Sequence, residues 1–459
     1  MTNLTSLSAA RHSRAQQAIP GPAGQPLLGH MLAFQQDRLG FLRRLQRDFG
    51  DVARYRLAHL AFVQISHPDG VRHILQEHHR NYQRGAFYAP VRKLIGNGLP
   101  ASDGDFWLRQ RRLMQPAFHH RIVDGFAGVV TDATQALLAR WQPGETLDVS
   151  AELARLTMSI VSRALFSTPI SDDGDTLGQA VAVVLQDIAY RFEVPFYPPP
   201  AVPTPRNRRF RAAAERLDRL VYGLIAEREA RPEAAPDDLL TLLVTSRDAE
   251  TGEAMSPQQL RDELLALFVA GHETTANALS WALYLLAQHP DAAARLRAEV
   301  AQALDGRTPA LADLPNLPYT RQVLDETMRL YPPAWIFNRT AQADDEIGGY
   351  FIPAGTTVAF SQYVTHRHPD FWEDPDRFDP ERFTPERSAE RPAYAYFPFG
   401  GGPHKCIGQG LALMEAHLAL ALIAQRAQWA LVPGRPVTPE AHVTLRPRGG
   451  LWMTLGPRA

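Results

Sequence analysis

The stretch of sequence that decides the fold is Phe399-Gly400-Gly401-Gly402-Pro403-His404-Lys405-Cys406-Ile407-Gly408. This glycine-rich loop leads directly into a strongly apolar helical segment. Cys406 is the only cysteine among 459 residues, which excludes an internal disulfide and a cysteine-based zinc cluster. A thiolate here would lie near the positive end of a helix dipole, with backbone N–H groups able to donate to its sulfur. The alternative is an inert cysteine packed in a tight turn.

The spacing Phe-x-x-Gly-x-x-x-Cys-x-Gly resembles the haem-binding loop of the cytochrome P450 superfamily, in which the cysteine thiolate is the axial iron ligand. The resemblance implies that Cys406 binds the iron of haem b and that Phe399, Gly402 and Gly408 contact the cofactor. It also implies the cytochrome P450 fold, an α+β architecture that is mainly helical with a smaller β-rich region. Haem would then lie between a long central helix and the helix that follows Cys406.

Composition and charge narrow the class of protein. Hydrophobic residues make up 45% and charged residues 21% of the chain, and the formal net charge is −1. These values are typical of a soluble globular protein and argue against nucleic acid as a partner. No run of about 18 apolar residues occurs, so we expect no membrane span. A single cysteine fits a reducing compartment, and we expect a cytoplasmic protein.

Residues 1–19 differ from the rest of the chain. They are polar, contain Arg11 and Arg14 and carry no acidic residue, which predicts a flexible leader; an organelle transit peptide is the alternative. Pro20-Gly21-Pro22 ends this leader. We expect a single domain over residues 20–459.

The longest predicted helix begins at a capping box, Ser256-Pro257-Gln258-Gln259, and ends before Pro290. Its middle reads Ala270-Gly271-His272-Glu273-Thr274-Thr275. A glycine and two threonines are unfavourable inside a helix, and such a break of local preference is expected at functional sites. The stretch resembles Ala-Gly-x-(Asp/Glu)-Thr-(Thr/Ser) in the same family. The resemblance implies that Glu273 and Thr274 deliver protons during oxygen activation and that Ala270 contacts the haem.

Other positions gain a role through the same resemblance. In the family, a Trp-x-x-x-Arg pair on a basic helix hydrogen-bonds a haem propionate, and the resemblance gives this role to Trp107 and Arg111. The alternative is a solvated basic face with a packed Trp. Arg339 matches a second propionate-binding arginine. His404 matches a propionate contact of some members, or is a histidine that packs within the loop.

Three charged residues resemble a structural network of the family. Glu326-Thr327-Met328-Arg329 places an acid and a base three residues apart on a predicted helix, and Arg382 follows in Pro380-Glu381-Arg382-Phe383. A pair of this kind is common on helix surfaces and contributes little there. The resemblance implies that Glu326, Arg329 and Arg382 form a buried network behind the haem loop, where each charge needs a partner.

The remaining pattern predicts elements around the site. We expect strands over 52–57 and 60–65, a short helix over 68–78, an irregular connection over 83–106, and hairpins over 348–356 and 443–452. Residues 194–205 are proline-rich and form either a lid over the substrate pocket or a plain linker. The pocket-wall candidates, almost all apolar, are Phe87, Leu99, Leu267, Ala334, Trp335 and Val443.

Together these motifs predict a haem-thiolate monooxygenase that uses O2 to hydroxylate an apolar small molecule, such as a terpenoid, steroid or fatty acid. The quoted sequence continues for about 50 residues after Cys406, so we expect no fused flavin reductase. Electrons from NAD(P)H would arrive through a separate ferredoxin and ferredoxin reductase or a flavodoxin-like donor. Two alternatives are a peroxide-driven enzyme, against which the Glu273-Thr274 pair argues, and a haem-binding sensor without turnover.

Overall fold

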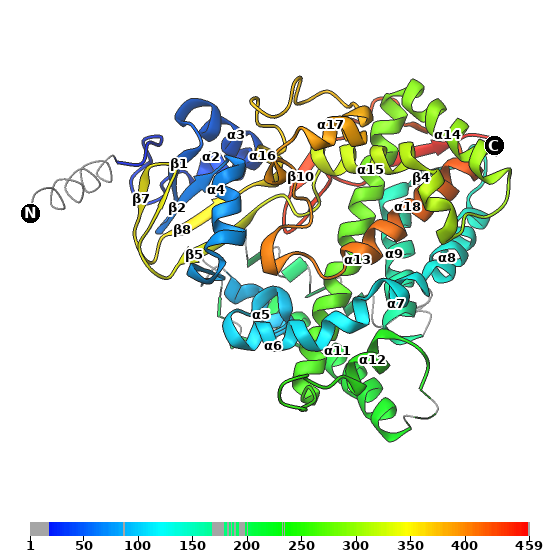
Figure 1. Cartoon of the computed structure of the whole chain (residues 1–459), viewed down its shortest axis with the longest axis horizontal. Coiled ribbons are helices and arrows are strands. Elements are labelled where there is room, and N and C mark those ends of the chain that lie inside the picture. The colour runs from blue at the N-terminus through cyan, green and yellow to red at the C-terminus, as the bar shows by residue number, and fades with distance from the viewer. Residues whose placement is uncertain are drawn as a thin grey trace, which may run out of the picture. The chain divides into compact units, whose positions relative to one another are not determined.

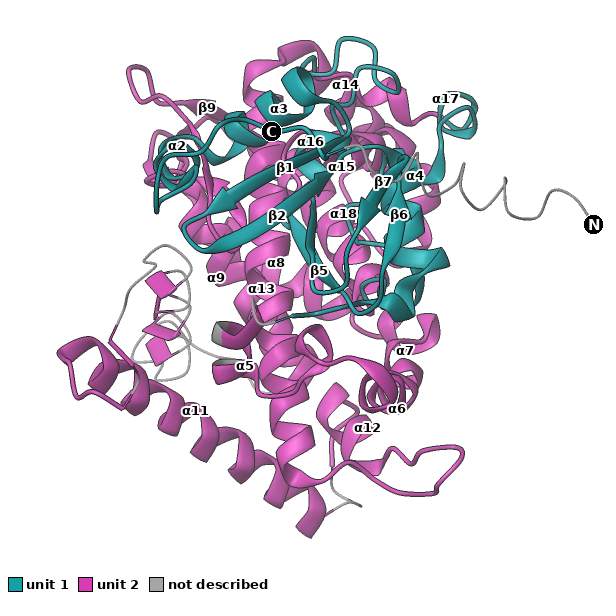
Figure 2. Cartoon of the chain, turned by 90° about the vertical axis from the view of Figure 1, so that its left-hand side faces the viewer, with its two compact units in different colours: residues 1–87, 334–377, 385–406 teal, residues 88–333, 378–384, 407–459 magenta. Residues whose placement is uncertain are grey.

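A computed structural model of the chain describes residues 18–85, 88–167, 179–180, 183–184, 186–187, 190–191, 198–199, 201–231, 233 and 235–457 (Figure 1). The predicted leader therefore lies almost wholly outside the described residues, as do Phe87 and residues 194–197 and 200 of the proline-rich stretch. The chain separates into two compact units made of interleaved segments (Figure 2). Unit 1 comprises residues 1–87, 334–377 and 385–406, and unit 2 comprises residues 88–333, 378–384 and 407–459. Each unit has its own hydrophobic core.

Unit 1 is built around a five-stranded sheet with the strand order β1-β2-β8-β5-β3. Its strands are β1 (Val52–Leu57), β2 (Leu60–Ile65), β8 (Thr357–Phe360), β5 (Phe337–Ala341) and β3 (Tyr82–Gln83). β2 and β8 pair in parallel, and the other neighbours are antiparallel. β1 and β2 form the hairpin that the sequence predicts. A second hairpin joins β6 (Asp345–Ile347) to β7 (Tyr350–Ile352) through two glycines at positive φ, as the glycine signal predicts.

Short helices complete unit 1. They are α2 (Met31–Gln36), α3 (Arg38–Phe49), α4 (Pro68–Arg72), the π-helix η1 (His73–Glu77), η2 (His79–Asn81), α16 (Gln362–Thr365), α17 (Pro385–Ala389), η9 (Ala393–Ala395) and η10 (Gly402–His404). The helix expected over 68–78 therefore changes from α to π geometry after Arg72. A hydrogen bond from the His78 N–H to the His73 carbonyl, 2.8 Å long, closes the π-turn.

Unit 2 is mainly helical. Its described helices are α5 (Ala89–Ile95), η4 (Leu99–Ala101), α6 (Gly104–Met114), η5 (Gln115–Phe118), α7 (His120–Asp124), α8 (Ala127–Arg140), α9 (Val149–Phe166), α11 (Pro205–Ala230), α12 (Leu239–Thr245), α13 (Pro257–Gln288), α14 (Pro290–Leu304), η7 (Leu311–Asn316), α15 (Pro318–Leu330), η8 (Pro380–Phe383) and α18 (Gln409–Arg426). Its strands are β4 (Thr146–Asp148), β9 (Trp429–Leu431), β10 (Pro439–Ala441), β11 (Leu445–Pro447) and β12 (Trp452–Leu455).

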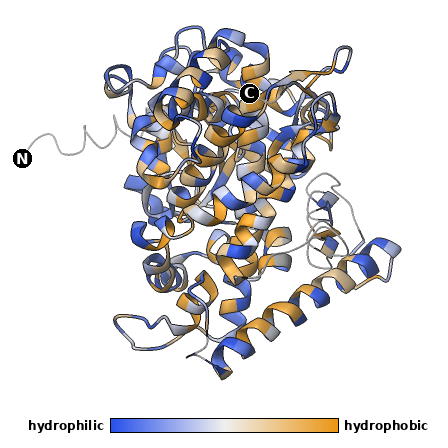
Figure 3. Cartoon of the chain, turned by 90° about the vertical axis from the view of Figure 1, so that its right-hand side faces the viewer, coloured by the Kyte–Doolittle hydropathy of each residue, from blue (hydrophilic) through white to orange (hydrophobic). Residues whose placement is uncertain are grey.

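The two most buried helices of unit 2 are α13 and α18. α13 starts with the predicted capping box: Ser256 Oγ accepts from Gln259 N, and the Gln259 side chain accepts from Ser256 N. Its 32 residues extend about 48 Å. Figure 3 colours the described residues by hydropathy. α18 is buried continuously from Met414 to Ala424, and apart from Glu415 and His417 this buried run is apolar. A helix of this kind belongs in the centre of a core, and α18 packs against α8, α13 and α14.

Two expectations about irregular regions are wrong. The connection expected over 83–106 contains α5 and η4, and α6 begins at Gly104, because Ile95 and Leu99 bury apolar side chains in the core of unit 2. The hairpin expected over 443–452 is shifted toward the N-terminus. β11 pairs with β10, while β12 pairs with β4 and β9. The Leu451 N–H bonds to the Asp148 carboxylate, 2.8 Å away, and this contact aligns β12 with β4 rather than with β11.

Among the described residues, one stretch, His120–Arg140, is long and apolar enough to qualify as a membrane span by composition. Core helices pass the same test. A turn at Gly125 divides the stretch into α7 and α8, and the 14 residues of α8 extend about 21 Å, which is short of a hydrocarbon core of about 30 Å. α8 also buries six side chains in the core of unit 2.

Candidate active site

The loop that carries Cys406 is held by its own backbone and by the π-helix. The Cys406 N–H donates to the Phe399 carbonyl at 2.9 Å, and the Lys405 N–H donates to the Gly402 carbonyl at 3.1 Å. Gly402 has φ +61°, and a Cβ at this position would come within 1.8 Å of the Leu75 carbonyl oxygen of η1. Glycine is therefore required at residue 402 by both backbone conformation and space. The folded loop leaves Cys406 exposed, so a metal can reach its sulfur.

The middle of α13 is open, although most of the helix is buried. Ala270 is exposed, and Gly271, Glu273 and Thr274 are partly exposed, whereas the turns on both sides of this stretch are largely buried. The Thr274 hydroxyl donates to the Ala270 carbonyl at 2.7 Å, which diverts that carbonyl's lone pair within the helix. A Cβ on Gly271 would lie 2.9 Å from the Val161 side chain of α9, so the glycine lets the two helices approach closely.

Glu273 is positioned by a residue that the sequence analysis missed. The Thr444 hydroxyl donates to Glu273 Oε1 at 2.8 Å, and Asn277 Nδ2 donates to the same hydroxyl oxygen at 3.1 Å. Thr444 stands in the turn between β10 and β11, far along the chain from α13. This chain of hydrogen bonds fixes the carboxylate of Glu273 independently of Thr274. His272 is buried, its Nδ1 lies 3.3 Å from the Phe268 carbonyl, and burial lowers its pKa.

The predicted charged network is assembled within unit 2. Arg329 Nε and Nη2 donate to the two carboxylate oxygens of Glu326 at 2.6 and 2.8 Å, and neither side chain is exposed. Arg382 Nε lies 3.5 Å from Glu326 Oε1, and the Asp379 N–H donates to the same oxygen at 2.8 Å. The carboxylate thus joins α15 to η8. Each buried charge has an opposite partner, which is the condition for tolerating charges in a core.

The other predicted site residues are divided between the units. In unit 1, Arg339 is buried on β5, and His404 Nδ1 lies 3.1 Å from Arg84 Nη1. Arg84 is itself buried and was not predicted, because a single arginine without distinctive spacing carries no sequence signal. In unit 2, Trp107 is buried on α6, Arg111 is half-buried on the same helix, and Gly408 caps α18.

The pocket-wall candidates are also divided. Leu99 on η4, Leu267 on α13 and Val443 beside Thr444 belong to unit 2, and their exposure ranges from buried Leu99 to exposed Val443. Ala334 and Trp335 belong to unit 1, where the Trp335 carbonyl accepts from Ser361 Oγ at 2.7 Å. Of these candidates, Leu267 alone lies on the same helix as Thr274.

The segment before α6 is bonded to α13 by two acids that the sequence analysis did not identify. Glu263 Oε2 accepts from the Leu99 N–H and Asp262 Oδ2 accepts from the Asn97 N–H, both at 2.8 Å. Glu263 is fully buried, and its Oε1 has no hydrogen-bond partner among the described residues. Burial raises the pKa of Glu263 to about 8; the Leu99 N–H opposes this rise, and the charge of Asp262 adds to it.

This raised pKa predicts a pH-dependent stability. The folded chain keeps the Glu263 proton up to about pH 8, whereas the unfolded chain releases it near the ordinary pKa of 4.5. Because the folded state binds more protons in this window, the contribution of Glu263 to the free energy of unfolding falls as pH rises through it. Glu263→Gln keeps an acceptor for Leu99. Its free energy of unfolding is expected to rise relative to that of wild type as pH increases, by on the order of 5 kcal/mol across the window.

Urea denaturation of both holoproteins at several pH values between 5 and 8.5 measures this difference. Other groups of the chain titrate equally in both proteins. The difference between the two free energies of unfolding therefore reports the titration of Glu263. If the free energies of unfolding of the two proteins change equally with pH, Glu263 is already ionised in the folded protein.

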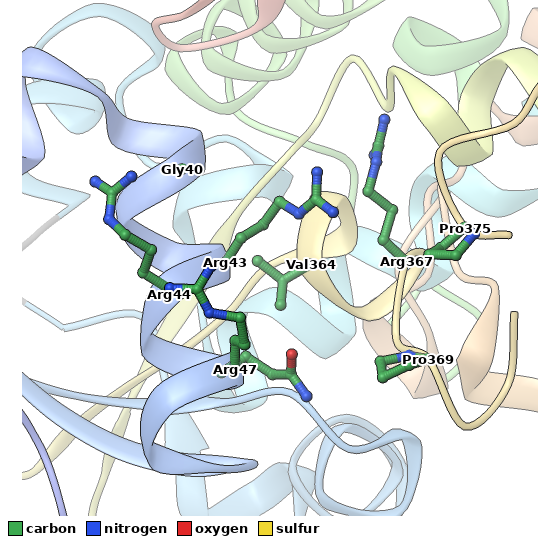
Figure 4. Close-up of a pocket in the computed structure, with 9 residues that line it drawn as sticks. Gly40, Arg43, Arg44, Arg47, Val364, Arg367, Pro369 and Pro375 are labelled. Carbon is green, nitrogen blue, oxygen red and sulfur yellow. The ribbon is translucent and has the colours of Figure 1, made fainter.

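A cavity of about 480 Å³ in unit 1 contains none of the predicted site residues (Figure 4). It is lined by Arg43, Arg44, Arg47 and Arg367, among others. Arg43 and Arg367 both donate to the carboxylate of Asp376, while Arg44 and Arg47 pair with Asp37 and Asp48. The positive charge of the cavity is thus largely balanced by these acids, and four arginines in its wall do not suit an apolar substrate.

Comparison with known proteins gives a consistent result. A sequence model of the family described as cytochrome P450 matches residues 19–453. A cyclooctat-9-en-7-ol 5-monooxygenase from Streptomyces melanosporofaciens is 39% identical over 414 residues, 90% of each chain. A pentalenene oxygenase from Streptomyces avermitilis is 34% identical over 92% of this chain and 94% of its own. The crystal structure of the cytochrome P450DA haem domain is similar with a TM-score of 0.88 at 30% identity, covering 96% of this chain and 97% of that one.

The chain belongs to the cytochrome P450 family. It is a haem-thiolate monooxygenase with the expected α+β fold, mainly helical with a smaller β-rich part. Within unit 1 the residues present fit the cofactor, because Cys406, the only cysteine of the chain, is exposed on a loop shaped by glycines. Within unit 2, α13 has small residues that are at least partly exposed at Ala270 and Gly271. When bound, the haem iron supplies the activation of O2 and the transfer of one oxygen atom to substrate.

Proposed function

We propose that the substrate is a terpenoid-class molecule, a cyclic hydrocarbon or its simple alcohol. The names of two relatives denote a hydrocarbon, pentalenene, and an unsaturated alcohol, cyclooctat-9-en-7-ol. The observation on this chain that carries the proposal is the open stretch of α13, where Leu267 and Ala270 accompany the Thr274 hydroxyl. Apolar side chains with one polar group are typical of sites that orient a hydrophobic ligand. The alternative substrates for an enzyme of this kind are steroids and fatty acids.

The reaction consumes one C–H bond, O2, two electrons and two protons, and it yields an alcohol and water. The electrons come from NAD(P)H through a separate ferredoxin- or flavodoxin-like donor, consistent with a cytoplasmic enzyme. Arg109 and Arg112 on the basic helix α6 could contact an electron donor, but both are engaged within unit 2. Arg109 pairs with Glu253 at 3.2 Å, and Arg112 pairs with the buried Asp248 at 3.2 Å. Lys405, which is exposed beside Cys406, is the better candidate for donor contact.

Glu273 and Thr274 supply the protons. The Thr274 hydroxyl donates to the Ala270 carbonyl, so it must break that hydrogen bond before it can donate toward the open side of α13. Glu273, held by Thr444, can replace the proton that Thr274 passes on. Arg111, Arg339 and His404 would hold the propionates, with Trp107 beside Arg111, because guanidinium groups pair well with carboxylates. Phe399, Gly402 and Gly408 shape the loop around the Cys406 thiolate.

Thr274→Ala is expected to keep haem but to lose coupling. Without the hydroxyl, proton delivery fails, reduced oxygen leaves as hydrogen peroxide, and product formed per NADPH falls by roughly tenfold or more. Product, peroxide and NADPH are measured in the same reaction.

Thr275→Ala is the matched control, because Thr275 makes the same kind of bond, to the Gly271 carbonyl at 3.2 Å, but is buried. Thr444→Val removes the hydrogen bond to the Glu273 carboxylate. It should raise the ratio of peroxide to product, by less than Thr274→Ala does. Unchanged product per NADPH in Thr274→Ala would refute the proton-delivery role.

The substrate class is tested by titrating the purified ferric holoenzyme with terpenoid hydrocarbons, terpenoid alcohols, steroids and fatty acids while following the haem Soret band. A saturable low-to-high-spin shift with the terpenoid compounds supports the proposal, because it reports ligand entry and loss of axial water. A shift confined to steroids or fatty acids would overturn the substrate class while leaving the enzyme class intact.

A further inference from the structure

Unit 1 contains a cluster of two histidines and one aspartate that the proposed function does not use. His73 begins the π-helix η1, His78 follows its end, and Asp345 begins β6. One nitrogen from each imidazole and one oxygen of the carboxylate all lie within 4.8 Å of one another. The end of α4, which leads into η1, and the β6–β7 hairpin lie side by side in Figure 2.

The π geometry explains why the two imidazole rings meet. A hydrogen bond over five residues aligns residue 73 with residue 78, whereas an α-helix would align residue 73 with residue 77. The ring centroids are 4.0 Å apart and the planes differ by 16°, so the rings are stacked. π-turns are rare and frequently mark functional positions. Here the turn presents His73 Nε2 and His78 Nδ1 to the same carboxylate oxygen.

The donor distances are close to those of a metal site. His73 Nε2 lies 2.8 Å and His78 Nδ1 lies 4.0 Å from Asp345 Oδ2. Donor atoms in a tetrahedral zinc site, each 2.0–2.1 Å from the ion, are about 3.3 Å apart. The two observed distances lie on either side of this value. Because the lone pairs of stacked rings lie in nearly parallel planes, the His78 ring has to turn out of the stack to direct Nδ1 at the same ion as His73 Nε2. His78 is half-exposed and can rotate without disturbing the core.

We propose that His73, His78 and Asp345 bind a divalent transition-metal ion of the Zn²⁺ type. The ion takes the place of the proton shared by His73 and Asp345 and adds His78 as a third ligand, which leaves a fourth position for water. Two imidazoles with one carboxylate suit Zn²⁺ better than Mg²⁺ or Ca²⁺, which prefer oxygen ligands.

The surroundings of Asp345 support this assignment. The Tyr82 hydroxyl donates to Asp345 Oδ2 at 2.8 Å, and the Glu346 N–H donates to Oδ1 at 2.8 Å, so the carboxylate is oriented before any ion arrives. Metal-binding carboxylates usually have such outer partners. An adjoining cavity of about 580 Å³, lined by His73, Glu77 and the β6–β7 turn, gives a path for entry.

Occupation of this site would tie η1 to the β6–β7 hairpin. The Leu75 carbonyl of η1 is the atom against which Gly402 of the Cys406 loop packs, and Gln76 accepts from the Tyr394 hydroxyl at 3.0 Å. The ion would therefore stiffen the helix that supports the cysteine loop without contacting the reacting atoms.

Isothermal titration of the chelator-treated holoenzyme with Zn²⁺ alone tests the proposal. We expect one equivalent to bind, His78→Ala to weaken binding by at least about tenfold, and Tyr82→Phe to weaken it by a smaller factor. His59→Ala, which removes an exposed histidine elsewhere in unit 1, is the matched control and should bind as wild type does.

Thermal unfolding with and without Zn²⁺ gives a second measurement. A rise in Tm on addition of Zn²⁺ that is present in wild type and His59→Ala but absent in His78→Ala supports the site. Zn²⁺ binding of equal affinity in wild type and His78→Ala, or the absence of a one-equivalent binding event in wild type, would overturn it. Neither outcome depends on the substrate or on catalytic activity.

Discussion

Cys406→Ala is expected to abolish the thiolate-type haem spectrum and all monooxygenase activity. Cys406 is the only cysteine in the chain, so no other thiolate can replace it. Its side chain is exposed, and its N–H bond to the Phe399 carbonyl is made by the backbone, so alanine should preserve the loop. The loss should therefore be one of ligation and not of folding. Absorption spectra of the reduced and ferric protein measure it, and circular dichroism measures the fold.

Lys405→Ala is the matched control for this variant, because it shortens an exposed side chain of the same loop and keeps the thiolate. It should retain the wild-type spectrum even if it weakens contact with the electron donor. A thiolate-type spectrum that persisted in Cys406→Ala would contradict the assignment of the ligand.

Glu326→Ala is expected to cause the largest loss of stability among single substitutions in the described charged network. It removes the carboxylate that accepts from Arg329 Nε and Nη2 in the core, where neither side chain is exposed, and it removes the acceptor of the Asp379 N–H. Removing one partner of a buried ion pair costs about 3–5 kcal/mol, a large share of the stability of most domains. We expect a soluble yield and haem content far below wild type, and a Tm lowered by several degrees in any protein recovered.

Glu381→Ala provides the comparison for this substitution. Glu381 belongs to the same short helix as Arg382 and pairs with Arg295 at 2.5 Å, but both side chains are about half-exposed. Exposed pairs contribute about 1 kcal/mol or less, so this variant should unfold close to wild type. Equal effects of the two substitutions would show that the buried network has no special structural role.

Much of the site could be predicted because its motifs are local. The cysteine loop, the capping box of α13 and the Glu326–Arg329 pair are each encoded within a few residues, and the structure shows their hydrogen bonds. The interruption of helix preference around Thr274 also marked the open part of α13. Whether these residues act as assigned stays a prediction that the variants above test.

The contacts that the sequence did not reveal are all long-range. Thr444 bonds Glu273 across 171 positions, Arg84 contacts His404 across 320, and Glu263 holds Leu99 across 164. Each donor or acceptor is a common residue type with no distinctive spacing, and only tertiary folding brings the partners together. The π-turn of η1 could not be predicted either, because its five-residue hydrogen bond depends on packing. The sequence pattern predicts a continuing helix after Arg72.

The measurement that tests the central claim most directly is a turnover with isotopically labelled oxygen. The holoenzyme, a surrogate ferredoxin with its reductase and NADPH are incubated under ¹⁸O2 with the terpenoid that gives the largest spin shift. A monooxygenase will yield an alcohol that carries one atom from O2, at a rate that requires NADPH and that falls in Thr274→Ala. Product without label, or NADPH consumption that ends only in peroxide for every ligand that shifts the Soret band, would contradict the account.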